Sequence, residues 1–487
     1  DALDEELPPR SAMKIPRSFQ IVLAALLVLL GGGSAPAQKT PAKLVVKEGD
    51  RIVFVGAGMG SRMNHFGYFE TELFLRFPQA KITIRNLCDE GNTPGFRPHP
   101  GRNQDAQYAF PGARDLVARR FQTNSGPKGF FESPDQWLTR LKADTVIAFF
   151  GFNSSFDGPS GIERYQKELD AFLKHTLKQR YNGSSAPQVA LISPTSFQDL
   201  SAKYGIPDGV AQNANLVLYT AAMREVAAAN GVLFVEAFSP SRAWYKDGKE
   251  YTTDGALLND RGYRALAPIL ADAIFGTGAA VAGKREAIHT AVTEKNWAWL
   301  NDYKIANGVH VYGRRYNPFG PANYPHELKK TREMTENRDR AIWWTLAGGD
   351  FDLAAADDKT PKLPPVKSNF RPGGKNGDPD YLKGPDSGSK IKVAEGYQIE
   401  LFASEEEFPD LANPVQIAFD NKGRLWVSTM SSYPHYRIGD PKPKDKLLIF
   451  EDTDGDGKAD KQTTFTDQLH IPIGFEISHD GVYVSQS

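Results

Sequence analysis

Apolar runs alternate with amphipathic segments through the first half of the chain. Five short apolar runs have the length of buried strands: Arg51–Val55, Ile82–Asn86, Thr145–Phe150, Val189–Ser193 and Val232–Glu236. Between them, helical periodicity is clearest over Gly161–Arg180, where apolar residues recur every three or four positions. This alternation predicts an α/β domain over residues 43–280, a parallel sheet with helices on both faces. We expect its ligand site beyond the carboxyl ends of the strands.

The pattern changes after residue 280. Residues 281–355 show no strand signal but are rich in tryptophan and tyrosine, which predicts a helical extension whose aromatic side chains belong to the core. Residues 356–391 are dense in Pro, Gly, Lys and Asp and form a linker. Short strand-like runs fill residues 392–487: Tyr397–Ser404, Pro414–Met430, Asp445–Asp454 and Gly474–Ser487. Such antiparallel strands predict the first blades of an all-β propeller, incomplete in this sequence because closure needs at least about four blades.

Composition narrows the functional classes. The 487 residues predict two or three domains. Lys and Arg number 58 against 59 Asp and Glu, so no overall field favours nucleic acid or an anionic membrane. Cys88 is the single cysteine, which excludes an internal disulfide, a CxxCH haem site and a CxxC zinc site within these residues.

The N-terminal segment carries an export signal. Lys14 and Arg17 precede the apolar run Ile21–Leu30, and Ala35-Pro36-Ala37 follows it. This pattern predicts a signal peptide over residues 13–37, cut after Ala37, and a secreted or periplasmic protein. The alternative is a membrane-spanning helix, but the ten-residue run is short of the roughly 20 residues that a bilayer requires. Residues 1–12 are acidic ahead of Met13 and fit upstream read-through.

Small and polar residues follow two of the predicted strands. Gly91 comes after the second strand and Asn153 after the third. A backbone N–H beside an asparagine amide can form an oxyanion hole, which donates to charge that develops in a tetrahedral intermediate. Taken singly, Asn153 could instead cap a turn and Gly91 could merely turn the chain.

In order, these segments resemble the four blocks of the SGNH (GDSL-type) hydrolase family. The sequence FVGAG, which ends at Gly58, stands where Gly-Asp-Ser is expected, DEGN supplies Gly91, GFN supplies Asn153, and TTDGALLND supplies Asp254 in place of Asp-x-x-His. The resemblance implies an SGNH-hydrolase-like, flavodoxin-type parallel sheet over residues 43–280. It also implies oxyanion-hole roles for Gly91 and Asn153 and a triad role for Asp254.

Two blocks differ from the family at the reacting groups. Gly58 replaces the nucleophilic serine and Leu257 replaces the general-base histidine. A glycine has no hydroxyl to attack a carbonyl, and a leucine cannot accept a proton. Ser61, one turn further along, is the candidate replacement nucleophile, whereas His65 is more simply a surface or capping residue. The pattern therefore predicts a hydrolase fold with a catalytically degenerate site.

An acidic repeat near the C-terminus predicts a calcium loop. Asp452, Asp454, Asp456 and Asp460 in DTDGDGKAD occupy loop positions 1, 3, 5 and 9, with a glycine at position 6. Position 12 is Thr463 where a glutamate is expected, and a strand-like run precedes the loop. We therefore expect Ca²⁺ to be held without flanking helices. The alternative is an acidic, hydrated turn.

Residues 396–461 resemble the large secreted PVC-type haem-binding CxxCH proteins with a "membrane-bound dehydrogenase" propeller. The resemblance implies oxidation of a sugar or alcohol, with a quinone cofactor or haem c in a cytochrome module beyond residue 487. His470, between two blade strands, would then be the base that removes a hydroxyl proton. A histidine in a turn is otherwise structural.

Two functions follow from different classes. In the first, the SGNH-like domain hydrolyses carbohydrate acetyl esters, and the dehydrogenase-type propeller oxidises the released sugar. In the second, the domain is a glycan-binding module that uses Gly91, Asn153 and Asp254 to hold a sugar. The replacements at Gly58 and Leu257 favour binding.

Overall fold

The computed structural model describes residues 43–122, 128–369, 382–434 and 436–486. The predicted signal peptide and the acidic segment before it lie outside these residues. In the part of the chain that the structure describes, no helix combines the length and the hydropathy needed to span a bilayer.

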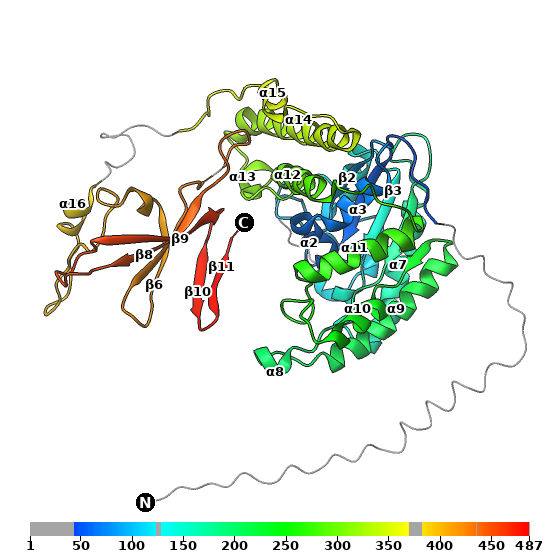
Figure 1. Ribbon diagram of the computed structural model, residues 1–487, viewed down its shortest axis with the longest axis horizontal. Helices are drawn as coiled ribbons and strands as arrows, with labels where there is room; N and C mark the ends of the chain where they lie inside the picture. Colours follow the sequence, from blue (N-terminus) through cyan, green and yellow to red (C-terminus); the bar gives the residue numbers. More distant parts are fainter. Residues whose placement is uncertain (1–42, 123–127, 370–381, 435, 487) are drawn as a thin grey trace, which may run out of the picture. The chain divides into compact units, whose positions relative to one another are not determined.

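A parallel sheet of five strands forms the centre of the α/β domain, in the order β2-β1-β3-β4-β5 (Figure 1). The strands are β1 Arg51–Gly56, β2 Thr83–Asn86, β3 Thr145–Phe149, β4 Gln188–Ile192 and β5 Leu233–Val235. Each overlaps one of the apolar runs, so the predicted flavodoxin-type sheet is confirmed. In this order β2 lies on one side of β1 and β3 lies on the other, so the order of the strands reverses between β1 and β3. Sheets of this kind bind ligands at that position.

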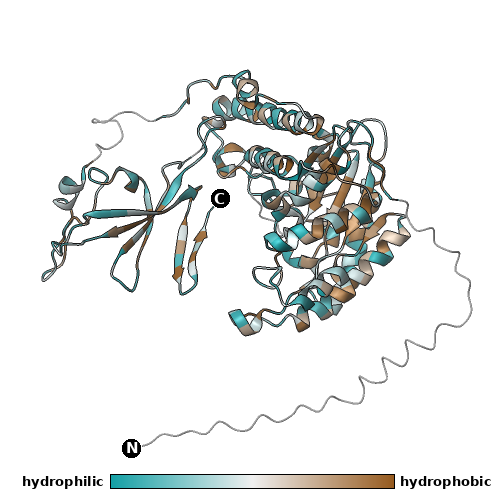
Figure 2. Cartoon of the chain, viewed as in Figure 1, coloured by the Kyte–Doolittle hydropathy of each residue, from teal (hydrophilic) through white to brown (hydrophobic). Residues whose placement is uncertain are grey.

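Both faces of the sheet are buried. Side chains alternate along a strand, so Ile52 and Phe54 of β1 enter the core on one face, and Val53 and Val55 enter the core on the other. This explains the uninterrupted apolar runs, and Figure 2 shows the hydrophobic colour concentrated on these strands. The first face is covered by α2 Gly58–Phe66, α3 Tyr68–Arg76 and α11 Asp260–Phe275. The second is covered by α5 Pro134–Arg140, α7 Ile162–Thr176 and α9 Val210–Ala229.

Shorter helices occupy the connections of this domain: α4 Ala113–Leu116, α6 Phe152–Ser155, α8 Ser201–Tyr204 and α10 Phe238–Trp244. The segment after α11 is helical, with α12 Arg285–Tyr303, α13 Gly308–Val311, α14 Gly320–Ala347 and α15 Leu353–Asp358. Helix α12 packs on α2, α3 and α14.

Two aromatic side chains of α12 are buried in the α/β core. The Trp299 indole N–H donates to the carbonyl of Asn86 at 2.9 Å, and the Tyr303 hydroxyl donates to the carbonyl of Leu87 at 3.0 Å. These contacts satisfy backbone groups at the end of β2. The helical segment is thus continuous with the core of the sheet domain.

A fully buried ion pair also fixes α12. Lys295 is 0% exposed, and its ammonium donates to the Glu70 carboxylate of α3 and to the Ile84 carbonyl at 3.1 Å. The Asn296 side chain donates to Glu70 Oε1 at 3.0 Å. Removing either member would therefore leave the other charged group buried without its counter-ion.

His99 lies in the loop after β2 and is held in its neutral form. Its ring stacks on Phe131 with centroids 3.6 Å apart. Nδ1 accepts the Gly101 N–H at 3.1 Å, so the proton is on Nε2, which lies 3.1 Å from the Tyr303 carbonyl. Burial, together with the positive charge of Arg102, lowers the pKa of His99 to about 3.

This geometry predicts a loss of stability in acid. The folded chain holds His99 neutral, whereas the unfolded chain protonates it below about pH 6.5, so stability falls as the pH drops from there toward 3. Between pH 7 and pH 4 the free energy of unfolding of the wild type should fall by about 3 kcal/mol more than that of His99→Gln. Urea unfolding at both pH values measures this difference. His479→Gln, whose side chain is 93% exposed in the wild type, is the control, and it should follow the wild type.

The C-terminal part is all-β. Strands β6 Pro414–Phe419, β7 Leu425–Thr429, β8 Asp445–Glu451 and β9 Lys461–Leu469 form a four-stranded antiparallel sheet in sequence order. Strands β10 Gly474–Ser478 and β11 Gly481–Ser485 form a hairpin, and the short helix α16 Gly384–Gly388 precedes them all. The antiparallel strands are confirmed. A four-stranded antiparallel sheet is also the unit of a propeller blade, and the propeller itself stays a prediction.

Two details of the all-β part differ from the sequence prediction. Tyr397–Ser404 is not a strand, because no neighbouring strand pairs with its backbone in the described residues, and Tyr397 is 77% exposed. Strand β9 was not predicted. It is an edge strand whose side chains are mostly exposed, so it lacks the apolar alternation of a half-buried strand.

Candidate functional site

The site begins where β1 passes close to β3. Gly56 has a φ of 136°, and a Cβ added there would lie 2.2 Å from the carbonyl oxygen of Phe149. Only glycine, which has no Cβ, allows the backbones of β1 and β3 to come this close. The Ala57 N–H donates to the same oxygen at 2.8 Å, and α2 starts at the next residue. The strand-turn-helix places Gly58 at the carboxyl edge of the sheet.

A cavity of about 190 Å³ opens at this edge. The residues that line it come from the segments after β1, β2, β3 and β4 and from the loop before α11: Ala57, Gly58, Met59, Glu90, Gly91, Phe149, Phe150, Phe152, Asn153, Pro194, Thr195, Ala256, Leu257 and Leu258. Four sequence-predicted positions, Gly58, Gly91, Asn153 and Leu257, are therefore brought together. Glu90 is the only ionisable side chain in this lining.

Gly58 and Leu257 face each other across the cavity wall. A Cβ added to Gly58 would lie 3.7 Å from Leu257 Cδ2 and 3.8 Å from Glu90 Cγ, which is ordinary van der Waals contact. Unlike Gly56, Gly58 is not required by close packing. The wall thus has room for a Cβ at position 58, and it presents a methyl group where a histidine base would be needed.

Asp254 is outside the lining of the cavity. Its Oδ1 accepts the N–H groups of Ala256 and Leu257 at 2.9 and 2.7 Å. The carboxylate therefore organises the turn before α11 and is exposed. Among the described residues the contacts of the triad position are local, and no histidine hydrogen-bonds to it.

Asn153 and Gly91 both line the cavity, on the segments after β3 and β2. The Asn153 amide nitrogen donates one hydrogen bond to the carbonyl of Asn92 at 2.9 Å, which fixes the side chain. Gly91 turns the chain with a φ of 82°. The arrangement leaves the second amide hydrogen of Asn153 for a ligand carbonyl or hydroxyl.

Ser61 lies in α2 and is not in the lining of this cavity. It is 1% exposed, and its hydroxyl accepts a hydrogen bond from the Lys304 ammonium at 2.7 Å. Although burial favours the neutral amine, the carboxylates of Asp89 and Glu90 raise the pKa of Lys304 above its ordinary value. A lysine that stays cationic cannot accept the proton of Ser61, so this pair has no general base.

Glu90 is the charged residue that the sequence prediction missed. Lys304 contacts it at 3.2 Å and contacts the neighbouring Asp89 at 2.8 Å. Burial favours the neutral acid, but the neighbouring Lys304 ammonium holds the pKa of Glu90 well below its ordinary value. Glu90 therefore places an ionised carboxylate, paired with Lys304, beside Gly58.

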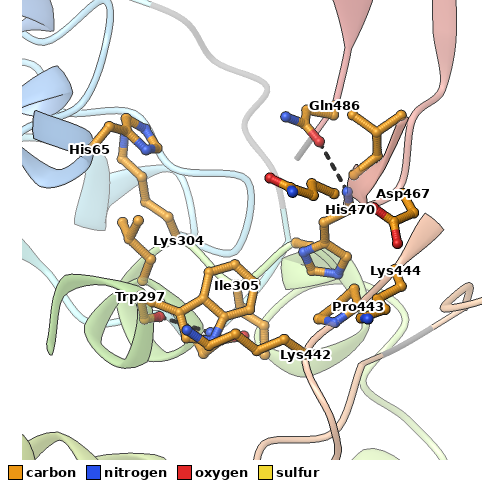
Figure 3. Close-up of a pocket in the computed structure, with 15 residues that line it drawn as sticks. His65, Trp297, Lys304, Ile305, Lys442, Pro443, Lys444, Asp467, His470 and Gln486 are labelled. Atoms are coloured by element: carbon orange, nitrogen blue, oxygen red, sulfur yellow. Dashed lines mark hydrogen bonds between the residues drawn. The ribbon is translucent and has the colours of Figure 1, made fainter. Parts of the chain in front are cut away.

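The two candidate histidines lie elsewhere. His65 is exposed near the end of α2, outside the lining of the cavity. His470 follows β9, and its backbone N–H donates to the Gln486 side chain at 2.9 Å (Figure 3). Its ring packs 5.9 Å from those of Trp297 and Tyr436, at a separate hollow of about 800 Å³.

Three of the four calcium-loop aspartates lie together. Carboxylate oxygens of Asp452, Asp454 and Asp460 are within 4.8 Å of one another, whereas Asp456 is not part of this group. The Asp452 carboxylate also accepts the N–H groups of the two loop glycines, at 2.7 and 2.9 Å. Position 12, Thr463, pairs with Ile449 in the ladder between β8 and β9. Hard oxygen ligands in a hairpin fit Ca²⁺ in chemistry, with fewer protein ligands than a complete EF-hand loop.

We expect Ca²⁺ to stabilise the all-β part if this cluster binds it. A chelator should lower the melting temperature of the wild-type chain by a few degrees, since an ion that binds only the folded state adds to its stability. Asp454→Asn should remove the response, while Asp480→Asn, in the β10–β11 turn, should keep it. A wild-type melting temperature indifferent to the chelator would refute the calcium prediction.

Comparisons with known proteins agree with this geometry. Residues 91–265 match the family described as "GDSL-like Lipase/Acylhydrolase family", and residues 384–487 match "Domain of unknown function (DUF7133)". No curated protein is similar enough to match the chain.

Among solved structures, the acetylxylan esterase Axe2 of Geobacillus stearothermophilus is 14% identical, with a TM-score of 0.32 over 47% of this chain and 96% of its own. The enzyme LAE5 from the Lake Arreo metagenome is 18% identical, with a TM-score of 0.32 over 47% of this chain and 96% of its own. The gut microbial diltiazem-metabolizing enzyme BT4096 is 16% identical, with a TM-score of 0.34 over 48% of each chain.

The flavodoxin-type strand order, the cavity between β1 and β3 and the match over residues 91–265 lead to one assignment. Over residues 91–265 the chain carries a domain that matches the GDSL-like lipase/acylhydrolase family.

Proposed function

We propose that the GDSL-like domain binds carbohydrate esters of the acetyl type without hydrolysing them. The observation that carries the proposal is the composition of the cavity. Gly91 and Asn153 remain as hydrogen-bonding positions, while Gly58 and Leu257 stand where the nucleophile and base would act. A site of this kind can hold an ester carbonyl but has no group to attack it.

The remaining polar groups support this proposal. Ser61 is buried against the cationic Lys304, and Asp254 is engaged by its own turn. The walls are mostly apolar, with aromatic residues from the end of β3, and so offer a surface for an acyl group or the apolar face of a sugar ring.

The test uses the full chain and acetylated xylo-oligosaccharide, a probe that carries ester carbonyls and sugar hydroxyls. Calorimetry should detect binding, and no acetate should be released above background. Asn153→Ala should weaken binding about fivefold, the effect of one lost hydrogen bond. Asn421→Ala, in the exposed turn between β6 and β7, is the control and should bind as the wild type does. Release of acetate that Ser61→Ala abolishes would overturn the proposal in favour of hydrolysis.

A further inference from the structure

Glu90 lies beside the place where a family nucleophile would react. Its Cγ would be 3.8 Å from a Cβ on Gly58, and it belongs to the lining of the cavity. The side chain is 59% exposed, so its carboxylate is accessible to a ligand. The sheet edge therefore presents a carboxylate beside the position where a family nucleophile would stand.

The Glu90 carboxylate is held in position by a largely buried lysine. Lys304, at the end of α12, joins Glu90 at 3.2 Å, Asp89 at 2.8 Å and Ser61 at 2.7 Å. Lys304 is itself largely buried, which limits the movement of its ammonium group. Glu90 thus meets a ligand as a charged hydrogen-bond acceptor whose position is set before binding.

We propose that Glu90 determines the ligand class of this cavity: a neutral sugar ester whose hydroxyl groups donate to the carboxylate, in preference to sugars that carry a carboxylate. The proposal rests on the proposed function and specifies the ligand of the same site. A hydrogen bond from a hydroxyl to a carboxylate is stronger than one between neutral groups. A ligand carboxylate in the same small cavity would meet a like charge, which is a means of rejecting it.

The other groups of the cavity agree with this selectivity. Asn153 offers an amide, Thr195 a hydroxyl, and the rest of the lining is apolar or small. The lining includes no lysine, arginine or histidine to pair with a ligand anion. Lys304, the cation that contacts Glu90, is already paired with both Asp89 and Glu90.

The experiment compares two probes on the full chain by calorimetry: neutral acetylated xylo-oligosaccharide and the same oligosaccharide bearing a glucuronic acid substituent. The wild type should prefer the neutral probe by at least about tenfold. Glu90→Gln keeps the shape but removes the charge, so it should bind the neutral probe about tenfold less tightly. It should also lose the preference. Glu90→Asp keeps the charge and should keep the preference.

Glu163→Gln is the matched control, because Glu163 is an exposed glutamate of α7 that pairs only with Lys167 among the described residues. It should bind both probes as the wild type does. Neutral-probe binding by Glu90→Gln at wild-type strength, or a wild type that favours the acidic probe, would overturn this proposal and leave the proposed function standing. A wild type that binds neither probe would overturn both.

Discussion

Replacement of Lys295 by methionine should lower the free energy of unfolding of the α/β domain by about 3–5 kcal/mol, the cost of leaving one member of a buried ion pair without its partner. Glu70 would keep the Asn296 hydrogen bond at 3.0 Å but lose the ammonium, and its side chain is 1% exposed. Its carboxylate could not reach water, and Arg85, a second buried cation that acts on Glu70, is already paired with Asp339. Thermal unfolding followed by circular dichroism should show a melting temperature lower by roughly 10 °C.

The double variant Lys295→Met/Glu70→Gln separates the ion pair from general packing. A neutral glutamine can still accept the Asn296 hydrogen bond, so most of the lost stability should return. Lys167→Met is the matched control, because the pair between Lys167 and Glu163 is largely exposed and should contribute less than about 0.5 kcal/mol. If Lys295→Met has the same melting temperature as the control, the buried pair does not hold α12 on the sheet.

The parallel sheet could be predicted because the residues of each strand indicate its burial without knowledge of the neighbouring strands. A strand buried on both faces is apolar at every position, and Val53 and Phe54 enter opposite cores of the same domain. The turn after β1 could also be recognised, since Gly56 has to be a glycine where β1 meets β3. The positions of Gly58, Gly91, Asn153 and Leu257 around one cavity then follow from the order of the strands.

The charged part of the site could not be predicted in this way. Ser61 and Lys304 are 243 positions apart, and no spacing rule links them. Lys304 reaches the site because α12 packs on α2 and α3, a tertiary contact that the amphipathic pattern does not specify. The sequence therefore offers Ser61 as a candidate nucleophile but does not indicate that Lys304 donates a hydrogen bond to its hydroxyl. Glu90 has no functional signal in the sequence, because a glutamate beside a glycine is typical of an ordinary loop.

Restoring the two missing groups should give the domain esterase activity. In Gly58→Ser/Leu257→His, the wild-type wall accepts a Cβ at position 58 with ordinary contacts, 3.7 Å from Leu257 Cδ2 and 3.8 Å from Glu90 Cγ. The new histidine follows Asp254, whose Oδ2 makes no hydrogen bond among the described residues and can orient the ring. Asn153 and Gly91, which we propose hold the ester carbonyl, line the same cavity. Hydrolysis of p-nitrophenyl acetate should rise about 100-fold or more over the wild type, within the range that a positioned base contributes.

The controls of this experiment separate a restored triad from a histidine acting alone. Gly58→Ala/Leu257→His has the base without the hydroxyl, and Gly58→Ser has the hydroxyl without the base, so each should stay close to the wild type if the groups act as one unit. Adding Asn153→Ala to the active variant should lower its rate by about 100-fold, the typical effect of losing one oxyanion-hole donor. If Gly58→Ala/Leu257→His were as active as the double replacement with serine, the imidazole would be reacting by itself. In that case the cavity would not have kept the geometry of an acylhydrolase, and its use as an ester-binding site would need another explanation.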